Sequence, residues 1–150
     1  MSRLLVDANL NPVPGADKFD ADLSKWDVSS VTDMRAMFYK ASSFNGDLSK
    51  WDVSRVTNIE AIFHDTSVFN GDLSQWHVSM VTNMQSTFAF AASFNRDLSQ
   101  WDVSKVSNMK EMFASASLFN GDLSKWDVSG VGNMNGMFGY ASSFKNGGLS

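Results

Sequence analysis

The chain has 150 residues, no cysteine and a formal net charge of −4. Its length suits a single domain, and the slight acidic excess argues against a nucleic-acid binder, whose surface would be basic. The absence of cysteine excludes a disulfide framework and thiolate chemistry. A hydrophobic content of 43%, with 13% aromatic residues, argues against disorder.

The segment 1–18 lies outside the repeated part of the sequence and contains both prolines of the chain. Apolar residues such as Leu5 and Val13 occur in it. Because the end of a repeat array needs a cap, we predict that residues 1–18 form an N-terminal cap segment. The apolar run before Asp7 is too short for a signal peptide, and no membrane insertion is expected.

From Phe19 onward the sequence repeats with a 25-residue period, without insertion or deletion. One tryptophan and two phenylalanines recur in each unit, in these columns: Trp26, Trp51, Trp76, Trp101 and Trp126; Phe38, Phe63, Phe88, Phe113 and Phe138; Phe19, Phe44, Phe69, Phe94, Phe119 and Phe144. Residues 19–143 hold five full copies and residues 144–150 a partial sixth. A period in this range indicates stacked repeat units.

Each unit begins with a predicted strand. Trp51 and Val53 alternate with Lys50 and Asp52, the period of two that is typical of a strand with one buried face. The tryptophan and valine are therefore expected inside, and the charged residues outside.

The second half of each unit predicts a short helix. In the second copy Val56, Ile59, Ile62 and Phe63 are spaced by three or four residues, which lines one helix face, and Thr57 is a candidate N-cap. Methionine and isoleucine replace one another in these columns, which indicates core packing rather than a sulfur–metal site.

A single unit buries too little apolar surface to fold alone, so the units must stack. The sequence thus predicts a right-handed α/β repeat solenoid, with one short parallel strand and one short helix in each 25-residue coil. The aromatic columns would become ladders in its core.

The outward strand positions form our candidate binding face, which we name the polar face. It comprises Lys25, Asp27, Lys50, Asp52, Gln75, His77, Gln100, Asp102, Lys125 and Asp127. His77 interrupts the aspartate column. The rival hypothesis is therefore a metal site of Asp52, His77 and Asp102, or a hydrolytic Ser-His-Asp set that uses Ser74 or Ser99. A flat exposed row lacks the enclosure that holds zinc, which favours a solvated histidine. No catalytic residue and no cofactor is therefore predicted.

A second acidic column precedes each strand and offers a further alternative: Asp22, Asp47, Asp72, Asp97 and Asp122. Either each carboxylate caps backbone N–H groups of its own turn, or the column, chiefly Asp47, Asp72, Asp97 and Asp122, binds calcium. Calcium needs six to eight oxygen ligands, which favours the caps.

Surface positions of the helical half vary freely among copies, whereas core columns hardly change. Such a pattern fits a non-enzymatic scaffold that binds a protein or a glycan, with a purely structural spacer as the alternative. Met80, Phe90 and Tyr140 are the expected exposed apolar anchors.

The unit F-N-G-D-L-S-K-W-D-V-S…V-x-N-M-x-x-M-F, complete at residues 119–138, is similar to the BspA-like bacterial surface-protein repeat of about 25–26 residues. The resemblance implies a leucine-rich-repeat-like solenoid in an adhesin-like protein, at the cell surface or outside the cell. It brings no catalytic residues. Because the last unit stops after Leu149, we also predict end-to-end association of copies through Phe144 and Leu149.

Overall fold

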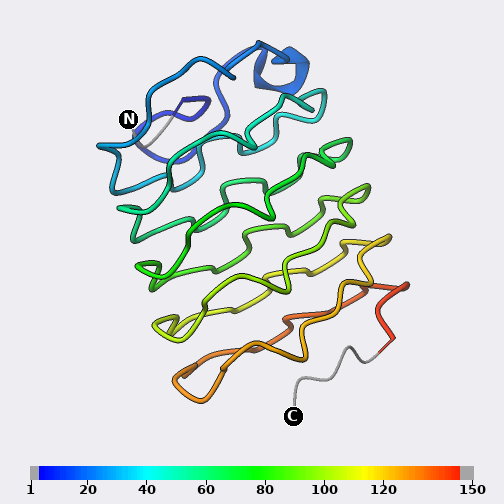
Figure 1. Cartoon of the computed structure of the whole chain (residues 1–150). Helices are drawn as coiled ribbons and strands as arrows, with labels where there is room; N and C mark the ends of the chain where they lie inside the picture. Colours follow the sequence, from blue (N-terminus) through cyan, green and yellow to red (C-terminus); the bar gives the residue numbers. More distant parts are fainter. Residues whose placement is uncertain (1–3, 146–150) are drawn as a thin grey trace.

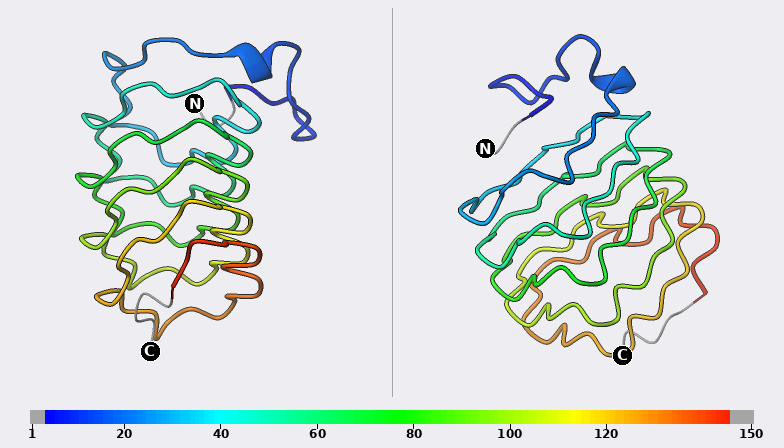
Figure 2. Two further views of the ribbon diagram at one scale, coloured as in Figure 1. Left: turned by 90° about the vertical axis from the view of Figure 1, so that its right-hand side faces the viewer. Right: turned by 45° about the horizontal axis from the view of Figure 1, so that its top comes forward.

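A computed structural model of the protein describes residues 4–145. The copies of the repeat form coils that stack on one another in chain order, with the N-terminal segment at one end (Figures 1 and 2). The helix in the described residues is η1, a 3₁₀-helix at Ala16–Lys18. The molecule is therefore a compact repeat fold built almost entirely from turns and short extended stretches.

Coils pair with one another through single parallel bridges rather than through long strands. The bridges join Asp33 to Asn58, Asn58 to Asn83, Asn83 to Asn108 and Asn108 to Asn133, so each is one coil from the next. An antiparallel bridge joins Val6 to Pro12 in the N-terminal segment. The pairing thus lies in the half of each coil for which the sequence predicted a helix.

The predicted helix is absent among residues 56–66, which form overlapping turns. The N–H groups of Ile62, His64 and Thr66 each donate to the carbonyl three residues earlier. The alternate N–H groups, such as that of Ala61, donate instead to carbonyls of the next coil, at 2.8 Å for Ala61 to Gln85. A helix is excluded because half of its backbone donors are engaged between coils.

The backbone of these turns includes left-handed residues, which an α-helix of L-residues does not contain. Ala61 has a φ of 53° and Asp65 a φ of 58°. The same two positions are left-handed in the other coils, at Ala36, Lys40, Ser86, Phe90, Glu111, Ser115, Gly136 and Tyr140. Thr57 is no N-cap, since its hydroxyl donates to the Thr32 carbonyl of the preceding coil.

The predicted strand is also not a strand, although its inward and outward positions are as expected. Trp51 and Val53 are buried while Lys50 and Asp52 are exposed. A turn flanks this stretch on each side: the Trp51 N–H bonds the Leu48 carbonyl, and the Val56 N–H bonds the Val53 carbonyl. The three residues 51–53 between the two turns are too few for a ladder of strand hydrogen bonds.

In place of strand hydrogen bonds, the tryptophan side chains bond neighbouring coils to one another. The indole Nε1–H of Trp51 donates to the Leu23 carbonyl of the preceding coil, 3.0 Å away. Trp76, Trp101 and Trp126 repeat the bond to Leu48, Leu73 and Leu98. Each buried indole donor is therefore satisfied, as burial requires.

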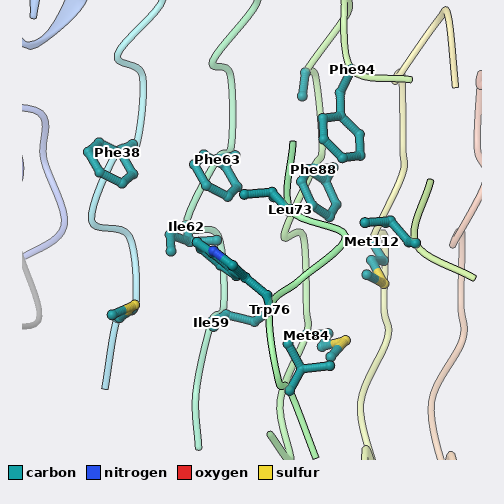
Figure 3. Close-up of a cluster of buried hydrophobic side chains, with 14 of the residues drawn as sticks. Phe38, Ile59, Ile62, Phe63, Leu73, Trp76, Met84, Phe88, Phe94 and Met112 are labelled. Carbon is teal, nitrogen blue, oxygen red and sulfur yellow. The ribbon is translucent and has the colours of Figure 1, made fainter. Parts of the chain in front are cut away.

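The core is the aromatic ladder that the sequence predicted (Figure 3). Phe63, Phe88 and Phe113 stack with ring centroids 5.5–5.6 Å apart. A second column stacks at 5.9–6.2 Å, as between Phe69 and Phe94. Within a coil the two rings lie closer still, 4.0 Å apart for Phe88 and Phe94. Methionine and isoleucine columns fill the space beside them, fully buried at Ile59, Ile62, Met84 and Met109.

Asparagine and hydroxyl side chains form further rows between coils. Asn70 N–H donates to Asn45 Oδ1 at 2.9 Å, and the same bond recurs from Asn95 and Asn120. Hydroxyl groups of Thr82 and Ser107 likewise donate to carbonyls one coil back. These bonds satisfy backbone groups that the short turns leave open.

The N-terminal segment contacts the first coil. Leu5 and Ala16 are buried within the same hydrophobic cluster as the coil residues, and Ser43 N–H bonds the Asp17 carbonyl at 3.1 Å. Phe144 stacks on Phe138 at 3.8 Å. Leu149, the other residue of the predicted association, lies outside the described residues.

Candidate binding surfaces

All ten residues of the polar face are exposed, as the alternation predicted. The coil register places their columns along one surface of the stack. A shallow hollow of about 410 Å³ lies on it, and its lining includes Lys50, Asp52, Gln75 and His77. The structure thus brings together the central part of the predicted face.

The aspartates of this face are engaged with their own turns. Asp102 Oδ1 accepts the Ser104 hydroxyl at 2.7 Å and the Ser104 N–H at 3.1 Å. Asp27, Asp52 and Asp127 accept the corresponding N–H groups of Ser29, Ser54 and Ser129. At His77 this cap is missing, and no bond to Ser79 replaces it in the described part of the chain.

The second acidic column caps its turns in the same way, as one of the two sequence hypotheses held. Asp47 Oδ1 accepts the Ser49 N–H at 2.9 Å, and Asp22, Asp72, Asp97 and Asp122 do likewise. Between residues 4 and 145, no three His, Asp or Glu side chains gather into a group that could hold a metal ion.

These caps shift the acidity of the aspartates. The hydroxyl and the N–H of Ser104 lower the pKa of Asp102, and matching serines lower the pKa of eight others: Asp22, Asp27, Asp47, Asp52, Asp72, Asp97, Asp122 and Asp127. Bonds to the charged form favour ionisation. The caps are therefore strongest when the carboxylates are ionised.

We expect the protein to lose stability in acid. A carboxylate whose folded pKa lies below its unfolded value stabilises the fold above the unfolded pKa of about 3.9 and stops doing so as pH falls through the folded pKa. The aspartates' contribution to the urea midpoint should hence be level from neutral pH to about pH 5 and fall below about pH 4.

Carbon-detected NMR titration of the aspartates gives the direct check. Asp102→Asn, which keeps a cap oxygen without the charge, should reduce the acid loss slightly. Titration midpoints for the nine aspartates at or above the ordinary aspartate pKa of about 3.9 would contradict the expectation.

The residues of the polar face do not form the rival hydrolytic site. His77 is exposed beside Lys50 and Asp52 in the shallow hollow. The hydroxyl oxygens of Ser74 and Ser99 accept bonds from the neighbouring glutamines, at 3.4 and 3.1 Å. Neither serine bonds His77 among the described residues, so no nucleophile–base pair is formed.

A second surface, which we name the ladder edge, follows the left-handed turns. It consists of the three variable columns that begin at Arg35, Tyr39 and Lys40 and recur with the 25-residue period. Tyr39 stacks on His64 with centroids 4.8 Å apart, and His64 contacts Phe90 at 5.4 Å. Copies thus place different chemical groups at equivalent positions on a constant backbone.

One hollow of the ladder edge, of about 160 Å³, lies next to the N-terminal segment. Its lining includes Leu10, Tyr39, His64, Arg35 and Glu60, and the last two approach to 3.5 Å between Nε and Oε1. Burial, more than any nearby charge, lowers the pKa of His64. Its Nδ1 and the Nε of Arg35 are buried without a hydrogen-bond partner.

Another hollow of about 330 Å³ lies near the C-terminal end of the ladder edge. It is bordered by Phe90 and Tyr140, whose residues are 50% and 91% exposed. The sequence singled out both as anchors but missed Glu111, Tyr39 and His64. Tyr39 and His64 belong to a column that varies among the copies, and this variation is the signal that could have found them. The predicted helix placed that column and its neighbours on different faces.

The fold defines the chain as a repeat protein of stacked 25-residue coils. A profile of the family described as "Mycoplasma protein of unknown function, DUF285" matches residues 11–91 and again residues 72–150, so the chain belongs to this family. No curated protein and no solved structure matches the chain. Within the described residues, no helix is both long and apolar enough to cross a bilayer.

Proposed function

We propose that the protein is a non-enzymatic repeat scaffold that binds a protein or glycan partner on its exposed columns, as part of a surface protein. The observation that carries this proposal is the contrast between constant core columns and variable surface columns. Phe38, Phe63 and Phe88 are identical and buried, whereas the ladder edge presents Lys40, Asp65, Phe90, Ser115 and Tyr140 at one backbone position. A rigid core with changing exposed groups suits recognition.

The proposal includes kinship with the leucine-rich-repeat-like arrays of bacterial surface proteins and their right-handed coil. The 25-residue period supports it, as do the parallel bridges through Asn58, Asn83 and Asn108 that join the coils. The turns that replace the predicted helix make this chain a compact variant of such an array.

Two multiple variants test the proposal and locate the site. The polar-face variant carries Gln75→Ala and His77→Ala, and the ladder-edge variant carries Phe90→Ser and Tyr140→Ser. All four residues are exposed, so each variant should keep the melting temperature of the parent.

Binding is read on a glycan array and by affinity capture, with each captured protein then purified and its binding measured directly. The proposal expects specific binding that one variant loses and the other keeps. Absence of any specific ligand would favour the structural spacer instead. Binding that both variants retain fully would place the site on neither surface.

A further inference from the structure

The aromatic side chains of the ladder edge form a row with one gap. Tyr39 and His64 stack at 4.8 Å, and His64 contacts Phe90 at 5.4 Å. Phe90 belongs to the neighbouring column, which holds Ser115 in the next coil and Tyr140 in the coil after that, so an aromatic ring returns at Tyr140. The 330 Å³ hollow occupies this gap.

The gap has an apolar floor and aromatic ends. Ala114, Gly136 and Gly139 line it between Phe90 and Tyr140. The two rings belong to coils two steps apart, and in the core column each step between rings is 5.5–5.6 Å. A group held midway between two rings at twice that spacing would lie within the ~6 Å reach of a cation–π contact with both.

A carboxylate lies beside the same gap. Glu111 lines the hollow, and its Cγ is 3.4 Å from where a Cβ on Gly136 would stand, so its side chain lies against the next coil. Lys110 Nζ approaches Glu111 at 3.6 Å, but both side chains are well exposed. Such a surface pair contributes little, so an incoming cation can replace the lysine.

We propose that this hollow binds a basic side chain of a protein partner, an ammonium or guanidinium held between Phe90 and Tyr140 and paired with Glu111. This inference rests on the proposed scaffold function. Two exposed aromatic rings attract a cation through their faces, and the carboxylate supplies the matching charge. The net charge of −4 favours the approach of a basic partner.

A glycan is the less favoured occupant. The polar side-chain groups that line the hollow in the described part of the chain are the Glu111 carboxylate and the hydroxyls of Ser115 and Tyr140. A pyranose ring carries several hydroxyl groups, and those that these three groups leave unpaired cost affinity. The scarcity of polar partners therefore favours a compact cation over a sugar.

Choline chloride is the probe, with 3,3-dimethylbutanol as its uncharged analogue of equal shape and sodium chloride matching the ionic strength. We expect choline to shift the backbone NMR signals of Phe90, Glu111 and Tyr140 in the full chain, and the alcohol to shift them much less. Phe90→Ser, Tyr140→Ser and Glu111→Gln should each weaken choline binding about threefold or more.

Serine suits both aromatic positions because Ser115 occupies the same left-handed column. Asp65→Asn, which removes a carboxylate from that column away from the hollow, is the matched control and should bind choline like the parent. An equal response to the alcohol, or no choline response at these residues, overturns the inference.

The scaffold function is judged separately. Partner binding that Tyr140→Ser and Glu111→Gln leave intact would overturn this site while the scaffold function stands. A glycan ligand lost in Tyr140→Ser, without any choline response, would assign the hollow to sugar and reject the cation.

Discussion

Replacing Phe88 with alanine should lower the free energy of unfolding by about 3–5 kcal/mol. Phe88 is fully buried at the centre of the ladder, between Phe63 at 5.6 Å and Phe113 at 5.5 Å. Removing the ring leaves a cavity and takes a stacking partner from both neighbouring coils. Because each coil depends on its neighbours for burial, the loss in one coil weakens both junctions.

Phe90→Ala is the matched control, since it removes the same side chain two residues away from a position that is 50% exposed. It should change the free energy of unfolding by no more than about 1 kcal/mol. Urea unfolding followed by far-UV circular dichroism measures the free energy of unfolding of both variants. The slope of that free energy against urea concentration shows whether the stack still unfolds as one unit. Equal losses in the two variants would contradict a buried ladder.

Ala61 gives the second large expected effect, because it distinguishes the observed turns from the helix that the sequence predicted. Its φ is 53°, which L-residues reach only with strain and which glycine adopts freely. Ala61→Gly should leave stability unchanged or raise it by up to about 1 kcal/mol, as relief of strain outweighs the entropy of the unfolded chain. Ala61→Val should cost about 1–3 kcal/mol, because a β-branched residue fits this conformation poorly.

Glycine at the equivalent position of the last copy, Gly136, has a φ of 65° and supports this expectation. In a helix, by contrast, Ala61→Gly would cost about 1 kcal/mol and valine less than that. Ala114→Gly is the control at a comparably exposed position that is not left-handed, and it should destabilise the protein by about 0.4–1 kcal/mol. A loss on Ala61→Gly as large as that on Ala114→Gly would contradict the left-handed turn.

Much of the interior was predictable from spacing alone. The apolar positions Val56, Ile59 and Ile62 are all fully buried, although they belong to turns and not to a helix. A chain of overlapping turns returns a side chain to the same face after three or four residues, as a helix does. Periodicity therefore identified the inward residues correctly and the element wrongly.

The candidate surfaces were likewise predictable in part. Exposure of the polar face follows from alternation around Trp51 and Val53, which short extended stretches share with strands. The row from Tyr39 through His64 to Phe90 could not be predicted, because it depends on which coil positions face outward together. A helix would have turned these columns by about 100° per residue and separated them.

By itself the sequence determined the stacking of coils and the aromatic ladder, since a fixed 25-residue period places identical groups beside one another whatever the backbone between them. Only the tertiary structure decided how each coil closes. Its backbone N–H groups have two sets of acceptors, within the turn and on the next coil, and the choice between them depends on contacts one repeat away. Ala61 and Asp65, whose N–H groups make such inter-coil bonds, are left-handed. The same stacking of coils forms the hollow that Phe90, Glu111 and Tyr140 line.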